Sequence, residues 1–65
     1  MHDSSFDIFW METKEENGPD SEWKTGNLGV RYLSNAKRQA AEIFEEGVVV
    51  QVRGKDTGKV YMTIR

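Results

Sequence analysis

Few residues of this sequence have the types and spacing that catalysis requires. There is no cysteine, and the single histidine, His2, stands next to the first methionine with no base or orienting partner nearby. Nucleophilic catalysis needs a nucleophile held beside a base that is itself oriented by a third group. We therefore expect no enzyme activity, no metal and no cofactor.

Acidic side chains form the next group that could do chemistry. Glu42, Glu45 and Glu46, with either Asp20 or Glu22, could make a hard-metal or acid–base cluster. Such chemistry requires carboxylates in an organised and partly buried pocket. Because the glutamates fall on the flank of a predicted helix that faces water, we interpret them as a solvated charge run.

Basic residues surround the start of that predicted helix. Arg31, Lys37 and Arg38, together with free backbone N–H groups and the positive end of the helix dipole, could bind an anion. The glycine spacing upstream matches neither the dinucleotide-binding nor the phosphate-loop pattern. The alternative is that Arg38 pairs with Glu42 one turn later while the other cations face water. These three cations are the candidate anion site.

The clearest structural pattern is a β-hairpin at residues 48–65. Two runs of alternating residues, 48–53 and 59–65, bracket a loop of Gly and Asp at residues 54–58. Gly58 fits the left-handed position of such a turn. One set of alternating positions is apolar throughout, so we expect it to face a core: Val48, Val50, Val52, Val60, Met62 and Ile64.

The remaining elements predict a single α+β domain over residues 1–65. Residues 6–13 read as an aromatic-rich strand, and a second strand begins at Trp23 and Lys24 after a mobile acidic loop at residues 14–21. Residues 34–46 have helical periodicity, with Ser34 as N-cap and Gly47 ending the helix. Residues 1–5 are expected to be flexible. The order ββαββ predicts an antiparallel sheet of three to four strands with one helix packed on one face. Besides the hairpin residues, the set predicted to face the helix is Phe6, Ile8, Trp10, Val30 or Tyr32, Ala40, Ile43 and Phe44.

The opposite face of the sheet is the main candidate interaction surface. It mixes apolar, aromatic and basic residues where a solvated face would be polar, and Trp23 is the expected exposed anchor beside it. This face could bind a protein or a second copy of the chain, stack nucleic-acid bases, or simply face water. The candidate residues are Phe9, Met11, Trp23, Val49, Gln51, Arg53, Lys59, Tyr61 and Arg65.

Charge and length bear on the choice between these readings. The net charge is −2, yet residues 1–23 hold seven acids and one lysine, whereas residues 24–65 hold eight bases and four acids. An acidic balance disfavours nucleic acid, whose binding depends on neutralising phosphates. A chain of 65 residues has a small core, which self-association would enlarge.

The sequence therefore predicts a small non-enzymatic protein-interaction domain. It would be homodimeric, or an accessory or inhibitor protein that binds another protein through the open sheet face. The alternative is a small nucleic-acid-binding module that uses the basic and aromatic face of the hairpin. A third reading, an enzyme subunit or small-ligand binder, requires a concave pocket near Arg31, Lys37 and Arg38. We expect a cytoplasmic protein, since no apolar stretch is long enough for a membrane span and the acidic start does not resemble a signal peptide.

Overall fold

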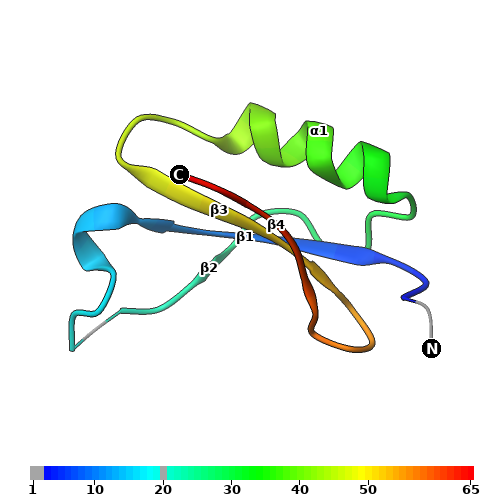
Figure 1. The fold of residues 1–65 in the computed structure, drawn as a ribbon, viewed down its shortest axis with the longest axis horizontal. Coiled ribbons are helices and arrows are strands. Elements are labelled where there is room, and N and C mark those ends of the chain that lie inside the picture. Colours follow the sequence, from blue (N-terminus) through cyan, green and yellow to red (C-terminus); the bar gives the residue numbers. More distant parts are fainter. Residues whose placement is uncertain (1–2, 20) are drawn as a thin grey trace.

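The chain folds as a four-stranded antiparallel sheet with one helix packed on one face, which confirms the predicted α+β class and ββαββ order. The computed structural model describes residues 3–19 and 21–65; His2 and Asp20 lie outside them. The elements are β1 (Phe6–Glu12), a short 3-10 helix η1 (Thr13–Glu15), β2 (Lys24–Thr25), α1 (Leu33–Ile43), β3 (Val48–Gly54) and β4 (Val60–Ile64). The strands lie in the order β2-β1-β3-β4 (Figure 1).

The core lies between α1 and the two central strands. In the register of β1 with β3, Ile8 lies opposite Val52, and both are completely buried. Ala36 and Ala40, one helical turn apart, are also completely buried. Their small side chains let the helix axis lie close to the sheet, because no side-chain bulk separates the two layers.

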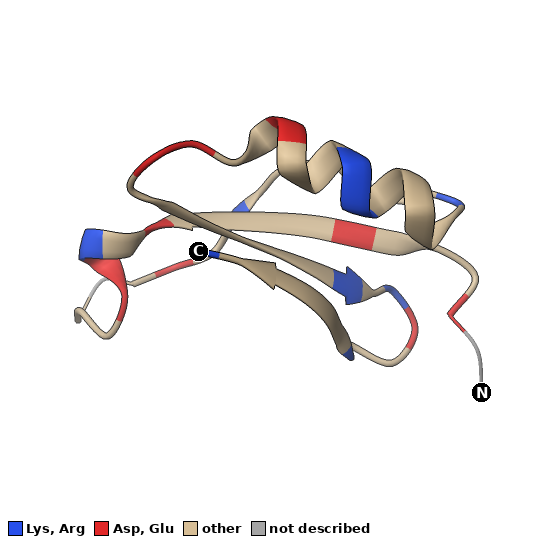
Figure 2. Ribbon diagram, turned by 45° about the horizontal axis from the view of Figure 1, so that its top comes forward, with Lys and Arg blue, Asp and Glu red and all other residues tan. Residues whose placement is uncertain are grey.

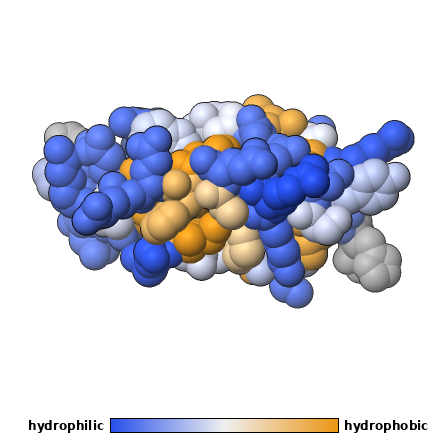
Figure 3. All heavy atoms as spheres, turned by 90° about the horizontal axis from the view of Figure 1, so that it is seen from above, coloured by the Kyte–Doolittle hydropathy of each residue, from blue (hydrophilic) through white to orange (hydrophobic). Residues whose placement is uncertain are grey.

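The helix covers only part of its face of the sheet. Seen from above α1, apolar surface remains visible between hydrophilic side chains (Figure 3). Several apolar residues at the border of the core are only partly buried: Trp10, Val30, Leu33, Ile43, Phe44, Val48, Met62 and Ile64.

No helix in the described part of the chain has the length and apolar character of a membrane span.

The helix begins and ends earlier than the sequence predicts. It starts at Leu33 after Tyr32, whose side chain makes no capping hydrogen bond, so Ser34 is not the N-cap. It ends at Ile43 because Phe44 turns extended, with φ −61° and ψ 133°, and packs against the core. Stopping there also keeps Glu45 and Glu46 out of the last turn, where the helix dipole disfavours negative charge. Gly47, at φ 84°, belongs to the turn before β3 and does not end the helix.

A β-bulge in the C-terminal hairpin changes which residues share a face. The register runs Val52 opposite Met62 and then Arg53 opposite Val60, so Tyr61 is an extra residue in β4. The prediction that Val60 faces the helix is wrong: it lies opposite Arg53 and is 44% exposed. Tyr61 is displaced from the open face and packs edge-on against Phe6, with ring centroids 5.2 Å apart.

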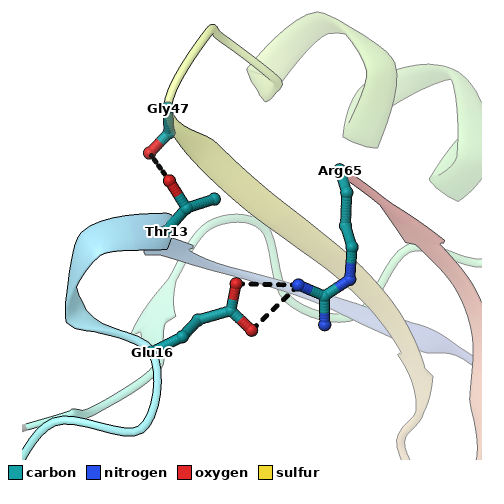
Figure 4. Close-up of polar contacts among 4 residues, drawn as sticks. All are labelled: Thr13, Glu16, Gly47 and Arg65. Carbon is teal, nitrogen blue, oxygen red and sulfur yellow. Dashed lines mark hydrogen bonds and ion pairs between the residues drawn. The ribbon is translucent and has the colours of Figure 1, made fainter.

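The face of the sheet away from α1, here called the helix-free face, is partly covered by the chain itself. Met11 and Val49 lie opposite each other on this face and are 4% and 0% exposed, so the prediction that they form an exposed surface is wrong. The acidic segment after β1 is attached nearby: the Thr13 hydroxyl donates to the Gly47 carbonyl, and Arg65 pairs with Glu16 at 2.8 Å (Figure 4). Sequence periodicity could not reveal this attachment.

Candidate functional site

An arginine-centred group of side chains forms the candidate site on the helix-free face. Its members are Phe9 from β1, Trp23 just before β2, and Gln51 and Arg53 from β3, and we call them the Arg53 cluster. The guanidinium carbon of Arg53 lies 4.8 Å from the ring centroid of Phe9 and 4.9 Å from that of Trp23. Both distances are within the range of cation–π attraction.

The strand register explains why these side chains meet. Phe9 lies opposite Gln51 in the β1–β3 pair, and Thr25 lies opposite Phe9 on the other side of β1. Arg53, two residues along β3 from Gln51, therefore reaches diagonally across β1 toward the start of β2. The Arg53 side chain thus connects β3 with β1 and with the segment that leads into β2.

Gln51 fixes the orientation of the guanidinium. Its side-chain oxygen accepts hydrogen bonds from Arg53 Nε at 3.0 Å and from Nη2 at 2.8 Å. This fork occupies one edge of the planar group, and the Nη1–Nη2 edge is engaged by none of residues 3–19 and 21–65. The arginine is therefore partly buried and held in one orientation by Gln51.

The other predicted surface residues do not join this cluster. Tyr61 and Lys59 lie together, with the Lys59 ammonium 5.1 Å from the Tyr61 ring, but on the side of Phe6 and Asp3. Arg65 is paired with Glu16. The structure thus retains four of the nine predicted residues at one place and assigns the others to internal contacts or burial.

A second polar group, which we call the Asp3 cluster, joins the N-terminal residues to the β3–β4 loop. Asp3 accepts hydrogen bonds from the backbone N–H groups of Asp56 and Thr57, each at 2.9 Å, and from the Tyr61 hydroxyl at 2.6 Å. Ser4 donates to the Asp56 carboxylate. Residues 3–5 are therefore held to the hairpin, contrary to the predicted flexible N-terminus.

The electrostatics of this cluster follow from the Asp3–Tyr61 hydrogen bond. That bond, supported by donors from Thr57 and Asp56 and opposed by desolvation, lowers the pKa of Asp3 from 3.8 to about 2. The same bond raises the pKa of Tyr61 above 10.0, because ionised tyrosine could no longer donate to the carboxylate. No sequence pattern links Asp3 to a loop more than fifty positions away, so the sequence could not identify this cluster.

The predicted anion site does not converge in the structure. Arg31, Lys37 and Arg38 are all exposed, and Arg38 donates to Asn35 at 3.4 Å in place of the expected pairing with Glu42. Tyr32 and Leu28, in the same region, are 63% and 61% exposed.

A hollow of about 370 Å³ lies between the end of β1, η1 and the turn before β3, at an end of the molecule that carries both acidic and basic positions (Figure 2). Its lining includes Glu12, Glu45, Glu46 and Lys14. Within residues 3–19 and 21–65, no group of three metal-ligating side chains comes together. None of the three cations of the predicted anion site lines this hollow.

No protein-family model, no curated protein and no solved structure matches the chain. Any functional conclusion consequently depends on the geometry of the two clusters and on the surfaces around them.

Proposed function

We propose that the protein is a small non-enzymatic interaction domain that binds a protein partner through its helix-free face. The observation that carries the proposal is the Arg53 cluster. Arginine and tryptophan are the residues most enriched at the energetic centres of protein interfaces. Here a tryptophan and an arginine lie together on a sheet face with part of their surface accessible.

The setting of the cluster favours a protein over a nucleic acid. A base would need an aromatic face for stacking, and one face each of Phe9 and Trp23 is occupied by the Arg53 guanidinium. Two of the other cations expected to bind phosphates are also engaged, Lys59 over Tyr61 and Arg65 with Glu16. The net charge of −2 opposes a polyanion as well.

Side chains of β4 extend the accessible surface beyond the Arg53 cluster. Thr63 lies opposite Gln51 and is exposed, and Val60 lies opposite Arg53. The accessible surface therefore continues from Trp23 across the cluster to β4. A second copy of the chain is one candidate occupant, although the burial of Met11 and Val49 removes two of the side chains expected at a dimer interface.

Site-specific photo-crosslinking tests this function. A photoreactive amino acid at position 63, on the helix-free face, is compared with the same group at position 41, which is exposed on α1. We expect one discrete adduct from position 63, with a protein of the source cells or with a second copy, and none from position 41. The absence of any adduct from position 63, or equal adducts from both positions, would overturn the proposal.

A further inference from the structure

Arg53 differs from the other arginines of the chain in being fixed without a counter-ion. Arg65 is paired with Glu16, and Arg31 and Arg38 are exposed. Arg53 is partly buried between Phe9 and Trp23, yet it forms no ion pair within the described residues. A partly desolvated cation without an anion gains more from binding one than a fully hydrated cation does.

Asp7, the acidic residue opposite Arg53 in the strand register, does not act as its counter-ion. Asp7 lies opposite Arg53 in the β1–β3 pair, but its carboxylate accepts a hydrogen bond from the backbone N–H of Gly29 at 3.0 Å. Gly29, at φ 69°, lies in the loop between β2 and α1. Asp7 therefore adds negative potential near Arg53 without occupying its free edge.

The shape of the free edge indicates the ligand. The Nη1 and Nη2 groups of a guanidinium donate two parallel hydrogen bonds, which match the two oxygens of a carboxylate. Gln51 and the two rings hold this fork before any ligand arrives, so little side-chain entropy is lost on binding. Phe9 and Trp23 would flank the methylene groups of an acidic side chain.

The surrounding charge selects a carboxylate over a phosphate. Asp7 lies opposite Arg53, Glu22 and Lys24 flank Trp23 and offset each other, and the chain has a net charge of −2. A phosphate carries up to twice the charge of a carboxylate and is repelled more strongly by these neighbours.

We infer that Arg53 is a receptor for the side-chain carboxylate of an aspartate or glutamate on the protein partner. This inference rests on the proposed function and specifies the chemistry at the centre of the interface: a partner segment with an acidic residue, whose carboxylate accepts from Nη1 and Nη2 of Arg53.

Nuclear magnetic resonance titration of the intact chain tests the receptor directly. The probe is N-acetyl-aspartate N-methylamide, the control probe is its asparagine counterpart, and sodium phosphate forms a third arm. The reporters are the Nε–H signals of Arg53, Arg31 and Arg38 and the indole N–H of Trp23. We expect a saturable shift in the millimolar range at Arg53 and Trp23 with the aspartate probe, at least threefold larger than at the exposed Arg31 and Arg38.

The controls make each outcome decisive. The asparagine probe should leave the Arg53 signal unmoved, and Arg53→Lys should abolish the saturable shift at Trp23, because an ammonium lacks the planar fork. An Arg53 response no larger than that of Arg31 and Arg38 would overturn the inference. So would a larger response to phosphate, which would point to nucleic acid.

Failure of this inference is distinguishable from failure of the proposed function. If the group at position 63 captures a partner and Arg53→Lys leaves that capture unchanged, the interaction face stands and the carboxylate receptor does not. If no partner is captured while the aspartate probe still saturates Arg53, the carboxylate site stands without the proposed interface.

Discussion

Replacing Arg53 by methionine tests the physical basis of the Arg53 cluster. Methionine keeps an unbranched apolar side chain of similar reach but removes the charge and the planar group. The variant loses two contacts with aromatic rings, at 4.8 Å and 4.9 Å. A cation–π contact at an exposed site contributes about 0.5–1 kcal/mol, so we expect a loss of about 1–2 kcal/mol in the free energy of unfolding.

This loss is measurable in a domain of this size. Typical stabilities per residue give a 65-residue chain about 3–10 kcal/mol in total. The variant should therefore remain folded. Its urea midpoint should fall by about 1–2 M if the slope of unfolding free energy against urea is near the low end for small proteins, about 1 kcal/mol per M. Tryptophan fluorescence at several protein concentrations supplies the unfolding curve and shows whether association contributes.

The matched control is Arg38→Met on the exposed surface of α1. Among the described residues Arg38 makes one weak hydrogen bond, to Asn35 at 3.4 Å, and methionine and arginine have similar helix propensities. We expect a change within about 0.5 kcal/mol. A double-mutant cycle of Arg53→Met with Trp23→Leu isolates the contact itself, with an expected coupling of about 0.5–1 kcal/mol and Trp10 as the remaining fluorophore.

Two results would refute the reasoning about this cluster. Equal destabilisation by Arg53→Met and Arg38→Met would show that the guanidinium gains nothing from the rings. A coupling energy of zero between Arg53 and Trp23 would show that the two side chains are neighbours without a stabilising interaction, and the fixed orientation on which the carboxylate receptor depends would be lost.

Three further predictions concern the Asp3 cluster and the core. Folding lowers the pKa of Asp3 from 3.8 to about 2. The stabilisation from its ionised form is therefore present above pH 4 and is lost as the pH falls toward 2. Acid unfolding curves of the native chain and of Asp3→Asn should differ in that range. A Cβ at position 54 would overlap the Asp3 carboxylate, so Gly54→Ala should return the pKa of Asp3 toward 3.8 in a carboxyl NMR titration, and an unchanged value would contradict the close packing. Ala40→Leu should lower the free energy of unfolding by about 1–3 kcal/mol through overpacking, whereas Ala41→Leu on the exposed side should change it little, as urea unfolding of both variants will show.

The fold class could be predicted because its signals are local. The alternation of Val50 and Val52, the glycine-containing loop with Gly58 at φ 74°, and the helical spacing of Ala36 and Ala40 each involve neighbours in the sequence. These patterns determine which element forms and which side of it is apolar. The helix on one face then follows from the need to bury those sides. The strand order β2-β1-β3-β4 does not follow from these patterns, because pairing between distant strands leaves no local signal.

The candidate site could be predicted only in part, because its details depend on contacts between distant segments. One extra residue, Tyr61, reverses the faces of the residues before it, and no composition signal marks that bulge. Met11 and Val49 looked accessible because alternation cannot show that the chain covers part of the second face. Arg53 and Trp23 were both recognised as surface candidates, but their stacking depends on the β1–β3 register.

The central position of β1 has a consequence for biosynthesis. Its main partner in the sheet is β3, which follows after both β2 and α1, and the contact of Asp3 with Tyr61 spans 58 positions. At a synthesis rate of about 5–20 residues per second, β1 is made a few seconds before β3. During that interval its aromatic-rich segment, FDIFWME, can contact β2, the bridge residue Val30 and α1, but it lacks the strand with which it forms its longest ladder. β1 is therefore the strand of this sheet whose apolar side chains wait for their main partner until most of the domain has been made.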